Sequence, residues 1–497
     1  MRILFFIHNV SKTRHFEGVL QSLAERGHSV VLAAARQRNR PLWLPKTLVF
    51  VNRSLIERGA PGRIEVTACP VRRVDRWQHV APALRTARDY LRFFDGRYAH
   101  ADKLRLRAAA QAPAAWRGYV DTHPWVRRHW RLLARGLALA EQVIPTDPFV
   151  DLFVRYERPD VILVTPLVDY GSYQTDVVKS AHRLGVPVIF APFSWDNLTN
   201  RGLIRVEPDR VLVWNERQKQ EAVDLHGVDA ARVVVTGAAR FDDFFRMRPA
   251  RSRDEFCRDL SLDPARPLLL YLCSSEFVAP REVDFVRRWI AAIRGSNDVT
   301  LRTAGILIRP HPAHLTQWRC AELGGFAHVA QWTGAETMNA DQGLYDSLFH
   351  AQAVVGLNTS AMIEAGILGK PVHTILTGGE FTGGQEQTLH FHYLRASNGG
   401  LLYESDGLEA HLSQLSETLH GGARHQQRCR AFVEAFVRPR GIDRPVAPVV
   451  VEEIEGAARI SKHARRQPAW SHAAALAVRI AVASRRALAG HRAEVRA

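Results

Sequence analysis

Two stretches of the sequence place polar side chains directly after apolar runs of strand length. The first is "ILIRPHPAHL", residues 306–315, in which four apolar residues precede Arg309, Pro310, His311 and Pro312. The apolar run predicts a parallel strand that is covered on both faces, and the prolines stiffen the turn that follows it. A guanidinium and an imidazole fixed at a strand end are suited to neutralising and hydrogen-bonding phosphate.

The second stretch is "VVGLNTSAMIEAGILGKPV", residues 354–372. Its predicted strand leads into three residue types that cap helices, Asn358, Thr359 and Ser360. A helix that begins at the carboxyl end of a parallel strand favours anions, because its free N–H groups and its dipole face the ligand. Glu364 follows Ser360 by one turn on the same helical face, where its carboxylate could accept hydrogen bonds from a ribose diol. The two stretches together predict a nucleotide site.

Two further segments carry weaker signals for the same site. Ser274 and Ser275 end the apolar run "RPLLLYLCSS". The segment "TGGEFTGGQEQTLHFHYL" has glycines that permit close backbone approach, followed by Gln385, Gln387, His390 and His392. No Cys or carboxylate set accompanies these histidines, so contacts to a sugar or phosphate are favoured over metal ligation. We expect Ser274, Ser275 and Gln385 to contact the donor, and we expect no metal.

The elements that must position these residues alternate between strand and helix. A first β-α-β unit is predicted over residues 3–7, 16–26 and 29–34, and it continues over 160–165, 172–184, 187–191 and 210–214. A second series runs from "RPLLLYLCSS" through "GILIRPHP", "AVVGLN" and "KPVHTI". The fold class is therefore α/β, with two Rossmann-like domains. We place them at residues 1–245 and 246–456, with a hinge near 240–252 and a tail over 457–497.

The positive charge is concentrated in two segments. The 497-residue chain has a formal net charge of +17. Residues 71–148 hold fifteen Arg or Lys against seven Asp or Glu, and residues 457–497 hold nine against one. The rest of the chain is close to neutral, which favours an acidic surface contacted at two places over a fold built on nucleic acid. We interpret the first segment as a basic helical insertion and the second as a basic helical tail.

Cysteine usage and hydropathy indicate the compartment. The five cysteines are scattered without a CxxC pair, so neither a disulfide framework nor a zinc knuckle is predicted. The first ten residues, "MRILFFIHNV", form too short an apolar run for a signal peptide and predict a first strand. No run of eighteen uncharged apolar residues occurs. We therefore expect a cytoplasmic protein that attaches peripherally to the inner face of the cell membrane.

At these residues the sequence resembles a family. "RPHP" followed by "NTSAMIEAGILGKPV" is similar to the donor domain of GT-B glycosyltransferases, especially capsule and lipopolysaccharide enzymes and relatives of CDP-glycerol glycerophosphotransferase. The resemblance extends back through "SWDNLTNRGLIRVEPDRVLVWNERQKQEAVDLHGV" and "VVVTGAARFD", and covers roughly residues 150–400. It implies two Rossmann-like domains facing a cleft, with the nucleotide on the C-terminal domain and the acceptor on the N-terminal one. It also implies that no metal is essential.

One departure from the family pattern concerns stereochemistry. Retaining enzymes of the commonest GT-B type carry a glutamate eight positions before the one matched by Glu364, and Gly356 stands there in this chain. This favours inversion, which needs a general base on the acceptor side. The candidates at predicted strand ends are Asp196, which we prefer, His15 and Asp169. Asp196 could equally form a turn or cap a helix, and His15 could belong to a cap region.

Three functions remain open at this point. The first is transfer of a sugar, or of a glycerol-phosphate-like group, from a nucleotide donor to a cell-surface polysaccharide or lipid-linked acceptor. The second is an epimerase of the UDP-N-acetylglucosamine 2-epimerase type. The third is a non-catalytic basic adaptor for membranes or nucleic acid. The crevice motifs argue against the adaptor and the paired basic segments against the epimerase, so we predict a transferase that binds no nucleic acid.

The segment "WVRRHWRLLARGLALAEQ" predicts the membrane contact. One helical stripe would contain Val126, Trp130, Leu133, Leu137 and Ala140, with Arg127, Arg128, Arg131 and Arg135 on the other side. The stripe could instead pack on its own domain and leave a solvated basic face. Each Lys or Arg near an anionic leaflet adds roughly 1 kcal/mol of attraction, so this segment and the tail would hold the protein reversibly at a membrane.

Overall fold

The computed structural model describes residues 1–35, 63–319, 321, 323–332, 334, 340–381, 384–421 and 424–459. The chain divides into two compact units. The first domain contains Met1–Gly96, Arg105–Val235 and the chain from Ala447 onward, and the second contains Arg97–Leu104 and Thr236–Val446. The division therefore falls about ten residues before the predicted one, and the residues just before the tail belong to the first domain. The tail beyond residue 459 lies outside the described residues.

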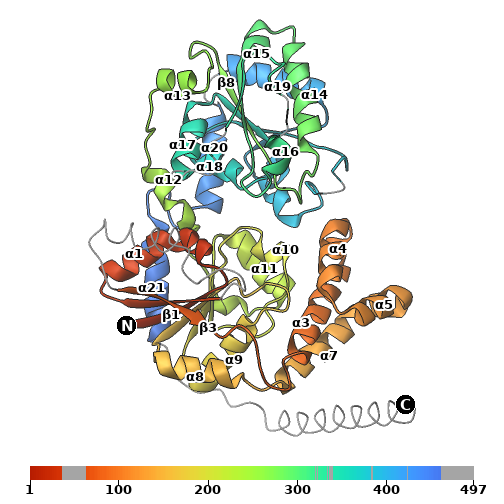
Figure 1. Ribbon diagram of the computed structural model, residues 1–497, viewed down its shortest axis with the longest axis vertical. Helices are drawn as coiled ribbons and strands as arrows, with labels where there is room; N and C mark the ends of the chain where they lie inside the picture. Colours follow the sequence, from red (N-terminus) through yellow and green to blue (C-terminus); the bar gives the residue numbers. More distant parts are fainter. Residues whose placement is uncertain are drawn as a thin grey trace. The chain divides into compact units, whose positions relative to one another are not determined.

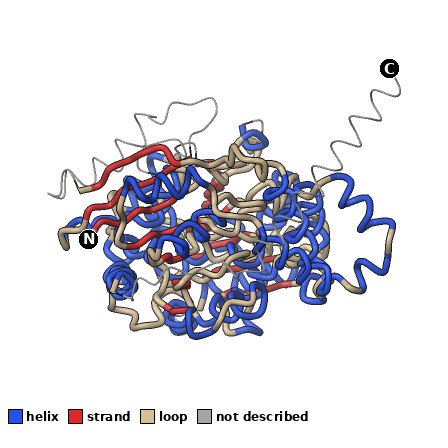
Figure 2. Tube along the Cα trace, turned by 90° about the horizontal axis from the view of Figure 1, so that it is seen from below, coloured by secondary structure: helices blue, strands red, loops and turns tan. Residues whose placement is uncertain are grey.

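The first domain is built on a seven-stranded parallel sheet in the order β3-β2-β1-β4-β5-β6-β7 (Figure 1). Its strands are β1 (Arg2–Ile7), β2 (Ser29–Ala35), β3 (Ile64–Cys69), β4 (Val161–Thr165), β5 (Val188–Phe190), β6 (Arg210–Val213) and β7 (Val233–Val235). The central strands are almost wholly buried, as expected when helices cover both faces of a parallel sheet. Figure 2 shows helices on both sides of the strands.

Among the described residues, six helices of this domain connect or flank those strands. They are α1 (Glu17–Glu25), α8 (Pro148–Glu157), α9 (Gln174–Leu184), α10 (Asn197–Asn200), α11 (Glu216–His226) and α21 (Val446–Ala458). Glu455 of α21 accepts a hydrogen bond from Arg26 and contacts His28 at 2.8 Å. At α21 the chain comes back from the second domain to the first. The contacts of Glu455 hold α21 against the turn between α1 and β2, which explains why this helix belongs to the first domain.

The predicted basic insertion is helical. It consists of α3 (Val80–Leu91), α4 (Asp102–Gln111), α5 (Ala114–Thr122), α6 (Pro124–Arg128) and α7 (Trp130–Val143). The single helix expected over residues 125–142 is interrupted at His129. The predicted stripe does face inward, since Val126 is buried and Trp130, Leu133, Leu137 and Ala140 are half-buried. Packing on its own domain is therefore the correct interpretation of that stripe.

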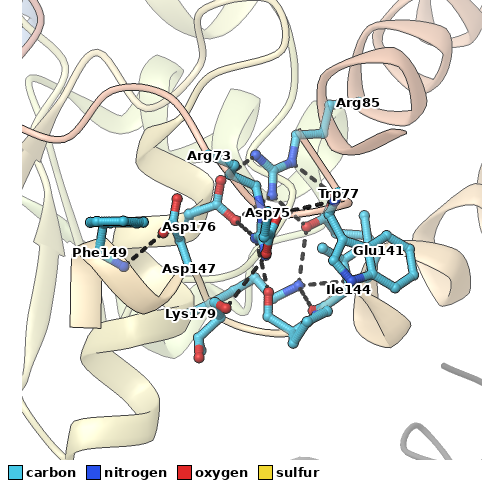
Figure 3. A network of polar contacts seen from close by, with 12 residues as sticks. Arg73, Asp75, Trp77, Arg85, Glu141, Ile144, Asp147, Phe149, Asp176 and Lys179 are labelled. Carbon is cyan, nitrogen blue, oxygen red and sulfur yellow. Dashed lines mark hydrogen bonds and ion pairs between the residues drawn. The ribbon is translucent and has the colours of Figure 1, made fainter. Parts of the chain in front are cut away.

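A network of charged side chains fastens the insertion to the first domain (Figure 3). Arg85 of α3 pairs with Glu141 of α7 at 2.9 Å and with Asp176 of α9 at 2.8 Å. Arg73 pairs with Asp176 at 2.8 Å, and Lys179 with Glu141 at 3.2 Å. Part of the insertion's positive charge is thus buried and neutralised, and is not available to an outside surface.

The second domain has a six-stranded parallel sheet in the order β10-β9-β8-β11-β12-β13. Its strands are β8 (Leu268–Leu272), β9 (Gly305–Arg309), β10 (Val329–Gln331), β11 (Ala353–Gly356), β12 (Val372–Ile375) and β13 (Leu402–Ser405). Four of them, β8, β9, β11 and β12, are the runs predicted from the sequence. The helices are α12 (Asp242–Arg246), α13 (Arg253–Asp259), α14 (Glu282–Arg294), α15 (Val299–Thr303), α16 (Thr316–Arg319), α17 (Ala340–His350), α18 (Ala361–Ile367), α19 (Leu408–His420) and α20 (Arg424–Phe436).

Candidate functional site

Arg309 is the last residue of β9 and stands in a partly desolvated position. Its Nη1 donates to the Gly343 carbonyl at 3.0 Å and to Ser347 Oγ at 3.1 Å, and the guanidinium lies 4.6 Å from the ring centroid of Trp332. Burial lowers the pKa of Arg309 to about 10, although Glu364 and two aspartates oppose this shift. The group stays cationic at neutral pH, and an anion placed beside it would offset its lost hydration.

Glu364 lies on α18 and is buried. Its Oε1 accepts a hydrogen bond from Arg240 Nη2 at 3.0 Å, and its charge acts on Arg309. The structure thus gathers the predicted pair Arg309 and Glu364, and adds Arg240, which the sequence interpretation missed. Arg240 lies in the stretch "VVVTGAARFD" that carries part of the family resemblance, but its pairing with Glu364, more than a hundred residues away in the chain, has no signal in the sequence. Glu364 thus makes an ion pair with Arg240 and also acts on the charge of Arg309.

The three predicted capping residues differ in burial: Asn358 is buried, whereas Thr359 and Ser360 are not fully buried. Within the described residues, the Ser360 side chain caps no N–H group of α18, and Thr359 and Ser360 are half-buried. The Asn358 side chain instead donates to Thr388 Oγ1 at 3.0 Å, and its backbone N–H donates to Ser274 Oγ at 3.4 Å. Asn358 therefore ties the loop after β11 to its neighbours, while Thr359 and Ser360 remain the candidates for contacting a ligand.

His311 follows Arg309 on the turn after β9. Its Nδ1 accepts the Ala313 N–H at 3.1 Å, so the neutral ring carries its proton on Nε2. Such a ring can donate a hydrogen bond to a phosphate oxygen. His311 therefore lies two residues after Arg309 at the carboxyl end of β9, where both were expected to contact phosphate.

Two of the predicted donor contacts, Gln385 and Ser274, have buried side chains. The Gln385 side chain is buried; its Nε2 donates to the carbonyls of Leu357 and Ile375, and its Oε1 accepts from Thr377. The Ser274 side chain is also fully buried. Both side chains hold the loops at the strand ends together. Ser275 is half-buried and its carbonyl starts the turn before α14.

Beneath that turn lies a buried carboxyl group that the sequence interpretation missed. Glu282 accepts the Ser274 N–H at 2.8 Å and the Tyr271 hydroxyl at 3.1 Å. Burial raises the pKa of Glu282 to about 8, against the opposing effect of these hydrogen bonds. The group is therefore mostly protonated at neutral pH, and it adds no full negative charge at the carboxyl end of β8.

In the first domain, the candidate bases gather around Phe193, which follows β5. The His15 ring stacks on Phe193 with centroids 5.2 Å apart, and Arg201 and Lys12 lie over the same ring at 5.5 and 4.7 Å. Arg201 also pairs with Asp169. Loops after β1, β4 and β5 thus converge at one edge of the sheet, as the sequence predicted.

Asp196 lies in this group at the start of α10. Its carboxylate contacts Asn197 Nδ2 at 3.4 Å and Asn200 Nδ2 at 3.5 Å, and it opposes the lowering of the Lys12 pKa that burial and neighbouring arginines produce. Asp196 is half-buried, whereas His15 is buried. The position suits both a helix-terminal residue and a base, so the catalytic role stays a proposal.

Beside this group the first domain contains a cavity of about 550 Å3. It lies at the carboxyl ends of β1, β3 and β4, and its polar lining includes His8, Arg72, Asp147 and Asp169. Asp147 is almost fully buried and caps α8 through Phe149 N. Burial raises the pKa of Asp147, and the charges of Asp176 and Asp75 add to this shift. Such mixed donors and acceptors suit a polyhydroxyl ligand.

No potential metal centre was found in the part of the chain that the structure describes. There, no group of three His, Cys, Asp or Glu side chains is arranged to hold a metal ion. The described helices also include none long and apolar enough to cross a membrane.

Comparisons with solved structures identify the fold. UDP-N-acetylglucosamine 2-epimerase from Neisseria meningitidis, bound to UDP-N-acetylglucosamine, superposes with a TM-score of 0.51 at 10% identity, over 92% of this chain and 100% of that one. A glycosyltransferase from Rickettsia africae ESF-5 gives 0.51 at 11% identity, over 93% and 99%. No family model matches the sequence, and no curated protein matches it significantly. The likeness confirms the expected fold of two Rossmann-like domains, the GT-B type, and leaves the reaction open.

Proposed function

We propose that the protein is an enzyme acting on a nucleotide-activated sugar, and specifically a glycosyltransferase. The observation that carries the proposal is the cluster of Arg309 with Glu364 and Arg240 at the carboxyl edge of the second sheet. Ligands of open α/β sheets bind at this edge, and two guanidiniums around one carboxylate suit a diphosphate beside a ribose. The donor would be held by Arg309, His311, Thr359 and Ser360, with Glu364 on the ribose.

The finer features of this function rest on the sequence as well as the structure. We propose a metal-independent, inverting transfer to a polysaccharide or lipid-linked acceptor, at the anionic face of a membrane. Asp196 would remove the acceptor proton, with His15 as the alternative base. Relationship to capsule, lipopolysaccharide or CDP-glycerol enzymes remains a prediction from the motifs.

The second candidate is an epimerase, because the Neisseria meningitidis enzyme shares the two-domain fold over almost the whole chain. It differs from a transferase in needing no acceptor. Incubation of the purified protein with UDP-N-acetylglucosamine alone, followed by NMR, separates the two. Appearance of a second sugar configuration without acceptor would support the epimerase and overturn transfer.

Titration calorimetry with UDP, CDP, GDP and CMP tests the shared part of both candidates. We expect one of these nucleotides to bind, and Arg309→Ala to weaken its binding. If none binds the wild-type protein, the assignment of the second domain to a nucleotide is wrong.

A further inference from the structure

The helical insertion presents an exposed stripe that differs from the one predicted. On α7 the residues Leu132, Arg135 and Leu139 follow one another at steps of three and four, which places them on one helical face. Trp125 and Arg128 precede them on α6, across the interruption at His129. All five are exposed: Trp125 at 46%, Leu132 at 69% and Leu139 at 54%, with both arginines in the same class. We call this set the outer stripe.

The aromatic end of the outer stripe is larger than Trp125 alone. Tyr119 of α5 is 41% exposed, and its ring meets that of Trp125 edge-on with centroids 6.2 Å apart. Trp116 lies beside Tyr119 at 6.1 Å. In Figure 1, α5 extends away from the first-domain sheet. Exposed tryptophan and tyrosine side chains in such a group match the composition of surfaces that sit at the level of lipid headgroups.

The charge around the outer stripe is predominantly positive. Residues 112–139 contain five arginines and a single acidic residue, Asp121, which already contacts Arg127 at 3.3 Å. Arg117, Arg128 and Arg135 have no carboxylate partner among the described residues. Three exposed guanidiniums without a counter-ion favour an anionic partner.

The order of residue types distinguishes a membrane from a protein partner. A helix packed along the outer stripe would have to cover Arg128 and Arg135, which alternate with its apolar residues, and burying unpaired charges is unfavourable. At a bilayer surface the same arginines reach phosphates while the Leu and Trp side chains enter the boundary region. We propose that the outer stripe, together with Tyr119, docks the protein on the headgroups of an anionic bilayer.

Vesicle binding tests this inference and requires neither donor nor acceptor, so its failure would leave nucleotide binding untouched. Full-length protein is co-sedimented with phosphatidylcholine vesicles that contain 30% phosphatidylglycerol, and with phosphatidylcholine vesicles alone. We expect binding to the anionic vesicles, at least about tenfold weaker in Arg128→Glu/Arg135→Glu because several favourable contacts are lost. The control Arg217→Glu/Arg258→Glu has the same change of charge at exposed sites outside the insertion and should bind like wild type.

A second measurement separates headgroup docking from simple charge attraction. Vesicles containing brominated phosphatidylcholine and phosphatidylglycerol should quench tryptophan fluorescence in the wild type and less in Trp125→Phe. Inorganic phosphate at millimolar concentration should not displace the protein from vesicles. Equal vesicle binding by Arg128→Glu/Arg135→Glu and wild type would overturn the inference and assign any binding to other basic segments. A wild-type dimer in light scattering that dissociates in Arg128→Glu/Arg135→Glu would assign the outer stripe to a second copy and also overturn it.

Discussion

Glu364 Oε1 lies 3.0 Å from Arg240 Nη2, and this ion pair joins the helix after β11 to the chain segment that enters the second domain. The pair is largely buried, with side-chain exposures of 6% for Glu364 and 18% for Arg240. Glu364 therefore has two functions in our interpretation. It neutralises Arg240 within the protein and leaves its charge acting on Arg309, which faces the proposed phosphate position.

Removing Arg240 should reveal how the pair is used. Arg240→Met leaves a buried carboxylate without its partner, so we expect the free energy of unfolding to fall by about 3 kcal/mol. Arg240→Met/Glu364→Gln should recover part of that loss, because the buried carboxylate is removed together with its partner. Urea denaturation of the two variants measures the difference. A double variant as unstable as Arg240→Met would contradict a direct interaction.

Arg309→Ala should weaken nucleotide binding without unfolding the domain. Loss of a charge-assisted contact to phosphate lowers affinity by about ten- to hundredfold. The matched control is Arg302→Ala, since Arg302 is exposed in the same domain and its side chain, among the described residues, bonds to the Ser296 carbonyl. Calorimetry with the nucleotide that binds wild type gives both affinities, and equal affinity in Arg309→Ala would remove this residue from the site.

The sequence predicted the strands better than the side-chain partners. Buried parallel strands are continuous apolar runs, so β8, β9, β11 and β12 could be recognised directly. The strand edge that gathers Arg309 and Glu364 followed from the rule that carboxyl ends of parallel strands meet. The sequence could not show that the Gln385 amide donates to neighbouring backbone carbonyls, because nothing in a sequence distinguishes a buried glutamine from an exposed one.

Contacts between distant residues were the other limit of prediction. Arg240 matters through its ion pair with Glu364, and the pKa of Asp147 is shifted by burial and by charges on other segments. No spacing pattern in the sequence predicts either interaction. The insertion shows the same limit in its surface. Two helical stripes were possible over residues 125–140, and only packing on the domain decided that Val126 faces inward and Leu132 outward.

Arg85 should be the residue on which the insertion's attachment depends most. It is almost fully buried and pairs with both Glu141 and Asp176, so Arg85→Met leaves two carboxylates short of a partner. We expect the free energy of unfolding to fall by about 3–5 kcal/mol. Arg131→Met removes a largely exposed arginine that lies 3.3 Å from Asp95, and should change stability by less than about 1 kcal/mol. Thermal or urea unfolding of both variants measures the contrast, and equal effects would contradict the proposed role of Arg85.

Glu282 should make stability depend on pH. Its pKa is raised to about 8 in the folded protein by burial, whereas an unfolded glutamate titrates near 4.3. Between these values the folded state holds a proton that the unfolded state has lost, so stability falls as pH rises from about 4.5 to 8 and then levels off. Glu282→Gln can accept the Ser274 N–H and donate to Tyr271, and it does not titrate.

The comparison is urea unfolding at pH 5 and pH 8. Wild type should lose more stability over this interval than Glu282→Gln, by about 3.5 kcal/mol. Glu417→Gln, on the exposed face of α19, should behave like wild type. A Glu282→Gln profile parallel to that of wild type would show that this carboxyl group does not titrate in the folded protein as described.

Asp196→Asn tests the proposed base and the stereochemistry together. Asn keeps the size of the side chain and its contact with Asn200 but cannot take a proton, so turnover should fall by about a hundredfold or more while donor affinity stays unchanged. Asp229→Asn, which alters an exposed cap in the same domain, serves as the control. NMR of the product of a sugar donor should show inverted anomeric configuration. A fully active Asp196→Asn enzyme would transfer the proposed role to His15, which stacks on the same Phe193 ring, and a retained configuration would remove the need for any such base.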